Sequence, residues 1–98
     1  MEEREYILTL YGIYKNLLST KEREYFEYYY FEDLSLQEIA DNYSVSKAYV
    51  GKYINSISKK LSKYEECLNI NFKNTEIKKL IKTIDEETRI KIENIIEK

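Results

Sequence analysis

Five lysines and no acidic side chain lie between residues 42 and 64, whereas residues 21–41 carry seven acidic side chains and two basic ones. Lysine attracts phosphate over about 10 Å at 0.1 M salt. A basic segment in a chain of net charge −2 is therefore typical of a helix that faces nucleic acid. A solvated lysine-rich surface would have the same composition, so charge alone leaves both interpretations open.

The composition excludes several kinds of catalytic and metal site. The 98 residues contain no histidine and one cysteine, Cys67, which rules out histidine-based triads, histidine-ligated zinc, CxxC sites and disulfide frameworks. Cys67 has no evident neighbouring base that would activate its thiol, and we expect it to be a passive apolar residue. The carboxylate pairs Glu65–Glu66 and Glu86–Glu87 are expected to be solvated. We therefore expect a non-enzymatic protein that uses no cofactor and no metal ion.

The length and hydropathy of the chain indicate one small domain with a helical appendage. With 35% charged and 43% apolar residues, the composition is globular rather than disordered. No segment approaches the roughly 20 apolar residues that cross a bilayer, and the acidic start does not resemble a signal peptide. We expect a cytoplasmic protein without membrane insertion, in which a single cysteine need not pair.

Apolar spacing and capping signals predict an all-α fold. Apolar residues at steps of three and four predict a first helix over 7–18. Ser19 with Glu22, and Ser35 with Glu38, form capping boxes that open helices over about 20–31 and 36–43. Ser46 caps a fourth helix, which reaches residue 68.

The helical period breaks at residues 69–74, and two amphipathic helices follow. The last of them is opened by Thr83 with Glu86 or by Asp85 alone. We thus predict a helical domain over 1–68, a connector over 69–74 and C-terminal amphipathic helices over 75–98. These helices either cover the first helix or lend an apolar face to a second copy, which would make the protein a homodimer.

Residues of about 35–61 fit a helix-turn-helix. Ala40 supplies the small residue that two closely crossing helices need, and Val45 and Val50 supply apolar contacts from the turn and from the second helix. Ser46 is placed to cap the second helix, which directs its first turn outward. Ser44 stands where glycine often adopts a left-handed conformation. Because serine is strained there, we expect a different or slightly longer turn.

The second helix of such a motif lies in the major groove of DNA, with its N-terminal residues near the base edges. Lys47 and Lys52 can bond guanine edges or phosphates, and Asn55 can pair with adenine. No arginine lies between residues 24 and 88, so the commonest bidentate reader of guanine is missing. The predicted nucleic-acid-binding residues, with DNA favoured over RNA, are Lys47, Tyr49, Lys52, Asn55, Ser56, Lys59, Lys60 and Lys63.

The aromatic run at residues 25–31 has two interpretations. It can stack unpaired bases, or it can be a core helix with Phe26, Tyr29 and Tyr30 facing inward. Its acidic neighbours would repel phosphate, which favours the core. The same acidic surface over residues 22–33 would suit a basic protein partner. Gly12, inside the first helix, is expected to mark a close packing contact.

Two further stretches stand out, Lys21-Glu22-Arg23-Glu24-Tyr25 and Tyr29-Tyr30-Phe31-Glu32-Asp33-Leu34-Ser35-Leu36. In these, and more broadly over residues 8–70, the chain resembles the YlxM-like family of small bacterial helix-turn-helix proteins. The resemblance implies a fold like the promoter-reading C-terminal region of sigma factors. It also implies an association with the signal recognition particle pathway of co-translational membrane targeting.

By position, the resemblance implies that Ser46 caps the recognition helix and that Val50 keeps the family's apolar position. Lys47 stands where arginine is usual, and Asn55 and Ser56 stand where basic residues are usual. Two hypotheses follow. The protein is a nucleic-acid-binding regulator near the signal recognition particle, or it is an adaptor that binds a component of the particle through its acidic helical surface.

Overall fold

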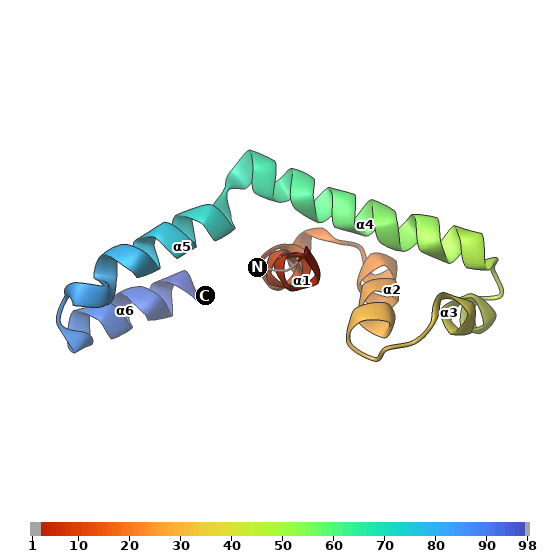
Figure 1. Cartoon of the computed structure of the whole chain (residues 1–98), viewed down its shortest axis with the longest axis horizontal. Helices are drawn as coiled ribbons and strands as arrows, with labels where there is room; N and C mark the ends of the chain where they lie inside the picture. Colours follow the sequence, from red (N-terminus) through yellow and green to blue (C-terminus); the bar gives the residue numbers. More distant parts are fainter. Residues whose placement is uncertain (1–2, 98) are drawn as a thin grey trace.

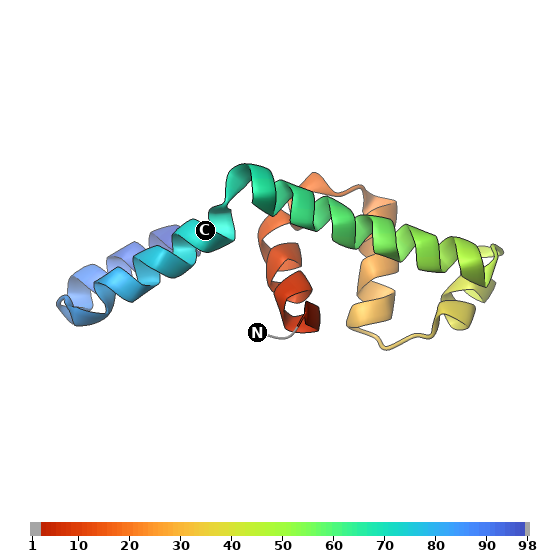
Figure 2. The same cartoon turned by 45° about the horizontal axis from the view of Figure 1, so that its top comes forward.

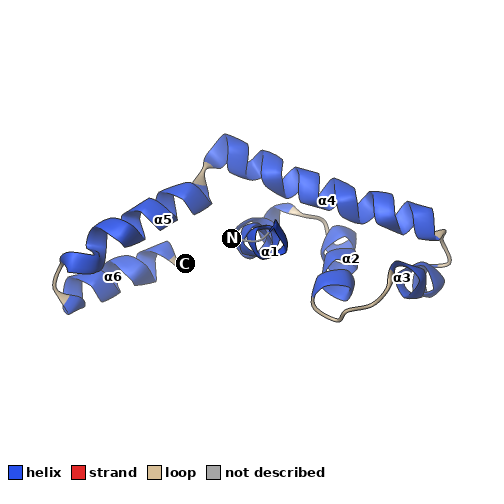
Figure 3. Ribbon diagram, in the orientation of Figure 1, coloured by secondary structure: helices blue, strands red, loops and turns tan. Residues whose placement is uncertain are grey.

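The computed structural model describes residues 3–97, which contain helices and no strand (Figure 3). The α-helices are α1 (Glu3–Tyr14), α2 (Thr20–Tyr30), α3 (Leu36–Tyr43), α4 (Lys47–Leu68), α5 (Ile70–Leu80) and α6 (Glu86–Ile96). Two single turns of 3-10 helix, η1 (Lys15–Leu17) and η2 (Ile81–Thr83), follow α1 and α5. The predicted all-α class is confirmed.

Local capping explains where α2, α3 and α6 begin. The Ser19 hydroxyl accepts from the Glu22 backbone N–H at 3.1 Å, and the Glu22 carboxylate accepts from the Ser19 N–H at 2.8 Å. Ser35 and Glu38 repeat this box at the start of α3. Of the two signals considered for the last helix, Asp85 is the cap, since its carboxylate accepts from the backbone N–H of Thr88 at 2.9 Å. These contacts satisfy N–H groups that have no partner inside the helix.

The first three helices pack against one side of α4, which is the longest helix (Figure 1; Figure 2). The core between them is apolar and aromatic, and its buried members outside the aromatic run are Ile7, Leu10, Tyr11, Tyr14, Leu18, Ile39, Ala40, Val50, Ile54, Ile57 and Leu61. Burying these side chains is the main source of stability for so short a chain.

The aromatic run belongs to this core, although not with the predicted faces. Phe26 is fully buried as expected, but Tyr29 and Tyr30 are only half-buried. Tyr25, which was not among the residues predicted to face inward, is 1% exposed and packs on Tyr43 and Tyr53 at 4.5 and 4.6 Å between ring centroids. The reason is that α2 contacts both α3 and α4, so more than one face of the helix is covered.

The first helix is shorter than the sequence predicted. It ends at Tyr14, and η1 turns the chain so that Leu17 is exposed while Leu18 is buried. A Cβ atom built on Gly12 would meet no atom within 4 Å, apart from the helix's own backbone. The prediction of a close packing contact at Gly12 is therefore wrong.

The predicted connector at residues 69–74 is helical except for Asn69. Asn69 adopts φ 54° and ψ 30°, the left-handed conformation that ends α4, and α5 starts at the next residue. The Glu65 carboxylate accepts from the backbone N–H groups of Asn71 and Phe72 at 3.0 and 3.1 Å. Because these bonds cap α5 from the preceding helix, α5 needs no connector. The expectation that Glu65 is solvated is wrong, since it is 7% exposed.

Helices α5 and α6 lie antiparallel, side by side, and extend away from the bundle formed by α1–α4 (Figure 1; Figure 2). The molecule is accordingly elongated, with extents of 54 × 25 × 24 Å. Lys78 on α5 reaches Glu97, just after α6, at 3.7 Å. Residue 98 of the predicted C-terminal segment lies outside the described residues. Within residues 3–97, no helix has both the length and the apolar character needed to cross a membrane.

Candidate nucleic-acid interface

Helices α3 and α4 form the predicted helix-turn-helix. Ala40 on α3 and Val50 on α4 are both fully buried, which allows the two helices to approach closely. Val45 in the turn is half-buried and packs against the same core. The three apolar scaffold positions therefore lie where the sequence predicted.

The turn between α3 and α4 contains a residue in the left-handed conformation, contrary to the prediction from the sequence. Ser44 adopts φ 54° and ψ 45°, and the Val45 N–H donates to the Ala40 carbonyl at 3.0 Å. This closure is the Schellman arrangement that usually contains glycine. The expected change of turn type is wrong: the turn geometry is retained, and the serine Cβ costs about 1 kcal/mol in a left-handed conformation.

Ser46 caps α4 as predicted. Its hydroxyl accepts from the backbone N–H of Tyr49 at 3.0 Å. Residues 47–49, at the start of α4, are exposed, and the first turn carries Lys47 and contains no acidic residue. The positive end of the helix dipole and the Lys47 ammonium therefore attract anions at the same place.

The side of α4 opposite the core carries a lysine stripe, formed by Lys52, Ser56, Lys59 and Lys63. These residues are all exposed and recur at i, i+4, i+7 and i+11, which places them on one face of the helix over roughly 16 Å. Figure 1 shows α1, α2 and α3 on the other side of α4. The Ser56 hydroxyl donates to the Tyr53 carbonyl at 2.6 Å, whereas no ion pair of the described residues involves the three lysines.

Asn55 is exposed beside this stripe, on the flank nearest α1. It lines a shallow groove of about 300 Å³ with Arg4 and Tyr30. The Arg4 guanidinium donates to the Tyr30 carbonyl at 3.0 Å and lies 5.0 Å from the Tyr30 ring centroid. An arginine that is distant in sequence therefore lines the same groove as the predicted adenine-reading side chain, which sequence spacing along α4 did not reveal.

Tyr49 lies on the opposite flank of α4, where α2 holds it. Its hydroxyl accepts from the Lys21 ammonium at 3.0 Å, and its ring stacks on that of Tyr53 at 5.8 Å between centroids. The hydrogen bond to Tyr49 raises the pKa of Lys21. Tyr49 remains 39% exposed, so part of its ring is open to a ligand. Lys21, although it belongs to the acidic segment 21–41, therefore places a cation at this edge of α4.

Lys60 is separate from the lysine stripe, because it forms an ion pair with Glu22 of α2 at 2.8 Å. Burial raises the pKa of Glu22, but hydrogen bonds from Lys60 and from the Ser19 backbone outweigh it and hold that pKa below its ordinary value. The same bond raises the pKa of Lys60. Glu22 is buried, so it is not part of the exposed acidic surface expected over residues 22–33.

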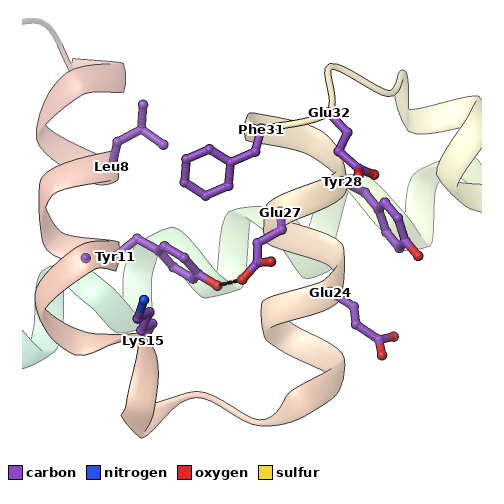
Figure 4. Close-up of a pocket in the computed structure, with 9 residues that line it drawn as sticks. Leu8, Tyr11, Lys15, Glu24, Glu27, Tyr28, Phe31 and Glu32 are labelled. Carbon is purple, nitrogen blue, oxygen red and sulfur yellow. Dashed lines mark hydrogen bonds between the residues drawn. The ribbon is translucent and has the colours of Figure 1, made fainter.

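A second surface feature is the acidic groove between α1 and α2, of about 570 Å³ (Figure 4). Figure 4 shows the Tyr11 hydroxyl donating to Glu27 and Phe31 pointing toward Leu8. Burial, with this hydrogen bond, raises the pKa of Tyr11 to about 12. The groove is lined by Leu8, Tyr11, Gly12, Lys15, Glu24, Glu27, Tyr28, Phe31 and Glu32. Among the described residues, no group of three or more histidine, cysteine or acidic side chains is arranged to hold a metal ion.

Comparison with known proteins gives a consistent picture. The sequence profile of one family, UPF0122, described as "Putative helix-turn-helix protein, YlxM / p13 like", matches residues 1–98. A UPF0122 protein of Ureaplasma urealyticum is 40% identical over 89 residues, which are 91% of this chain and 90% of that protein. A UPF0122 protein of Mycoplasma capricolum is 43% identical over 76 residues, 78% of this chain and 67% of that protein.

A third relative, a UPF0122 protein of Bacillus pumilus, is 40% identical over 77 residues, which cover 79% of this chain and 70% of the relative. These similarities extend well beyond α3 and α4 into the helices that support them. Together with the profile match over the whole chain, they identify its family. The chain belongs to the UPF0122 family of YlxM- and p13-like helix-turn-helix proteins.

Proposed function

We propose that this protein is a non-enzymatic regulator that binds nucleic acid, duplex DNA in the first place, through the exposed side of α4. The observation that carries the proposal is the lysine stripe. Its three ammonium groups face away from the core on a helix that has no acidic residue before Glu65. Each ammonium can neutralise one phosphate and release its counterions, which is the main source of sequence-independent affinity for DNA.

The positions of these residues along α4 suggest which of them contact bases and which contact phosphates. Lys47 and Lys52, near the N-terminus of α4, are closest to where a recognition helix meets base edges. Asn55 can accept and donate to adenine, with Arg4 beside it. Lys59 and Lys63 lie further along the helix and suit the phosphate backbone. Tyr49 and Lys60 play an indirect part, because both are bonded to α2 and fix the angle between α2 and α4.

The family resemblance supports placing this regulator in the signal recognition particle pathway. That part of the proposal depends on the resemblance alone. It makes the RNA of the particle a second polyanion to compare with duplex DNA. A helix-turn-helix reads the major groove of B-form DNA, and the deep, narrow major groove of A-form RNA does not admit a helix. We therefore expect tighter binding to duplex DNA.

The test is a titration of labelled duplex DNA and of particle RNA with the full chain at 0.1 M salt, followed by fluorescence anisotropy. The variant Lys52→Gln/Lys59→Gln removes two cations from the lysine stripe, and we expect it to weaken DNA binding at least tenfold, about the electrostatic contribution of one or two phosphate contacts. The matched control is Lys15→Gln/Lys91→Gln, which changes the net charge equally at exposed positions outside α4. Equal binding by the two variants would contradict the proposal.

The acidic groove favours a second candidate function, an adaptor that binds a basic component of the particle. Its lining combines the apolar side chains of Leu8 and Phe31, the latter 56% exposed, with the carboxylates of Glu24, Glu27 and Glu32. A basic amphipathic helix would match both features. Glu27 accepts from the buried Tyr11 hydroxyl, so reversing its charge would disturb the core. Glu24 and Glu32 are therefore the carboxylates to reverse, although Glu24 also accepts from the Tyr43 hydroxyl at 2.9 Å.

For this candidate we expect Glu24→Lys/Glu32→Lys to abolish pull-down of the protein component of the particle, while Lys52→Gln/Lys59→Gln leaves it unchanged. The variant Glu3→Lys/Glu5→Lys gives the same change of charge at the exposed start of α1 and serves as the control. Full retention of the partner after reversal at Glu24 and Glu32 would eliminate the adaptor function.

A further inference from the structure

The hairpin of α5 and α6 leaves most of its apolar side chains uncovered. Within the described part of this segment, Ile81 is the one large apolar side chain that is buried. Ile70, Ile77 and Leu80 recur on one side of α5, and Leu80 is 76% exposed. Ile95 of α6 is 72% exposed. Two short helices with uncovered apolar faces do not form a stable core of their own.

The exposed area of the chain is larger than a compact monomer should have. A monomeric protein of 11.9 kDa exposes about 6,000 Å². This chain exposes 6962 Å². The surplus of roughly 1,000 Å² is close to the ~800 Å² that each partner contributes to a stable interface. An interface over the hairpin would therefore bring the chain to the surface area of a normally folded protein.

The charges of the hairpin indicate what covers it. Residues 70–84 carry four lysines and one glutamate, whereas residues 85–97 carry five acidic side chains and two basic ones. The hairpin is thus basic along α5 and acidic along α6. A two-fold axis can bring α5 of one copy against α6 of the other, and the opposite charges of the two helices favour this pairing over α5 against α5. The Lys78–Glu97 contact at 3.7 Å is the same kind of pairing within one chain.

We propose that two copies of this chain associate through their α5–α6 hairpins, which pack as an antiparallel four-helix bundle with α5 of each copy against α6 of the other. Paired hairpins of this kind bury apolar faces in the bundle core and leave charged side chains at the edges. The interface lies at the opposite end of α4 from the helix-turn-helix (Figure 1). The dimer therefore leaves the first turn of α4 and the lysine stripe accessible, and it presents two copies of each.

The test is sedimentation velocity or light scattering of the full chain at about 50 µM. We expect a mass of twice 11.9 kDa for the native sequence. The variant Leu80→Glu/Ile95→Glu should be a monomer with unchanged helical circular dichroism, because both side chains are already mostly exposed in the single copy. The control Leu17→Glu alters an apolar side chain that is 54% exposed but lies in η1, and it should remain a dimer.

Charge reversal separates this arrangement from any other dimer. Lys73→Glu/Lys79→Glu should raise the dissociation constant at least tenfold, and addition of Glu86→Lys/Glu87→Lys should restore it, because the basic and acidic helices are then exchanged. A monomeric native chain, a larger oligomer, dissociation by Leu17→Glu, or no restoration in the fourfold variant would overturn the proposal.

Discussion

The Tyr14 hydroxyl donates a hydrogen bond of 2.6 Å to the buried carboxylate of Glu65, a residue 51 positions further along the chain. The same hydroxyl accepts from the Ile70 backbone N–H at 3.2 Å. Since Glu65 also accepts from the N–H groups of Asn71 and Phe72, the pair joins α1, the end of α4 and the start of α5. Burial, together with the bond to Glu65, raises the pKa of Tyr14 to about 12. This joint fixes the direction in which the hairpin leaves the bundle.

Removal of the Glu65 carboxylate should destabilise the protein much more than removal of the exposed carboxylate of Glu66. Glu65→Ala leaves one hydroxyl and two backbone donors without their acceptor, and each unsatisfied buried group costs about 1–3 kcal/mol. We expect a total loss of about 3 kcal/mol and a melting temperature lower by roughly 12–24 °C. Thermal unfolding followed by circular dichroism measures the melting temperature. Glu66→Ala, at the exposed neighbour, should change stability by less than about 0.5 kcal/mol. Equal losses of stability in Glu65→Ala and Glu66→Ala would contradict a structural role for the Tyr14–Glu65 hydrogen bond.

The left-handed turn residue offers a stabilising substitution. Ser44→Gly removes the Cβ from a residue at φ 54°, so the helix-turn-helix should gain about 1 kcal/mol. The midpoint of urea unfolding should rise with an unchanged slope. A lowered midpoint would show that Ser44 is not strained in the folded protein.

Gly12 is the site of a second stabilising substitution, which acts through helix propensity. Its φ is not positive and the space around its missing Cβ is open, so Gly12→Ala adds helix propensity without a clash. The expected gain is roughly 0.5–1 kcal/mol. Gly51→Ala is a useful comparison, because there the new Cβ would meet Leu36 at 3.6 Å, an ordinary packing distance. Urea unfolding measures both variants, and destabilisation by Gly12→Ala would contradict the open space around this residue.

Acid should weaken the contact between α2 and α4. The pKa of Glu22 is lower in the folded chain than its ordinary value of 4.5, so its contribution is present above that value and is lost as the pH falls through the folded pKa. Unfolding midpoints between pH 6 and pH 3 should therefore fall less steeply in Lys60→Gln. The variant should lose less than about 1 kcal/mol at pH 7, because solvent screens the half-exposed Lys60. Identical pH profiles would argue against the ion pair.

Sequence reasoning succeeded where the determining contacts are local. The capping boxes at Ser19 and Ser35 join residues three positions apart, so the helix starts could be read directly from the chain. Ala40 and Val50 could be predicted for a similar reason, since the spacing of a helix-turn-helix fixes which side chains meet.

The errors concern contacts between distant residues. The partner of Glu65 is 51 positions away and that of Lys60 is 38 positions away, so neither burial nor pairing is visible in local spacing. The wrong prediction of a connector over residues 69–74 has the same cause. The start of α5 has no side-chain cap from Asn69, and its N–H groups are satisfied from α1 and α4 instead. A single left-handed asparagine was enough to redirect the chain without a loop.

The salt dependence of DNA binding tests the central claim most directly, namely that the lysine stripe contacts phosphate. Each phosphate contact contributes about −0.9 to the slope of log K against log salt concentration. We predict that Lys52→Gln/Lys59→Gln makes the slope shallower by roughly 1.8, while Lys15→Gln/Lys91→Gln leaves it at the native value. A slope that is the same in all three proteins would contradict the account.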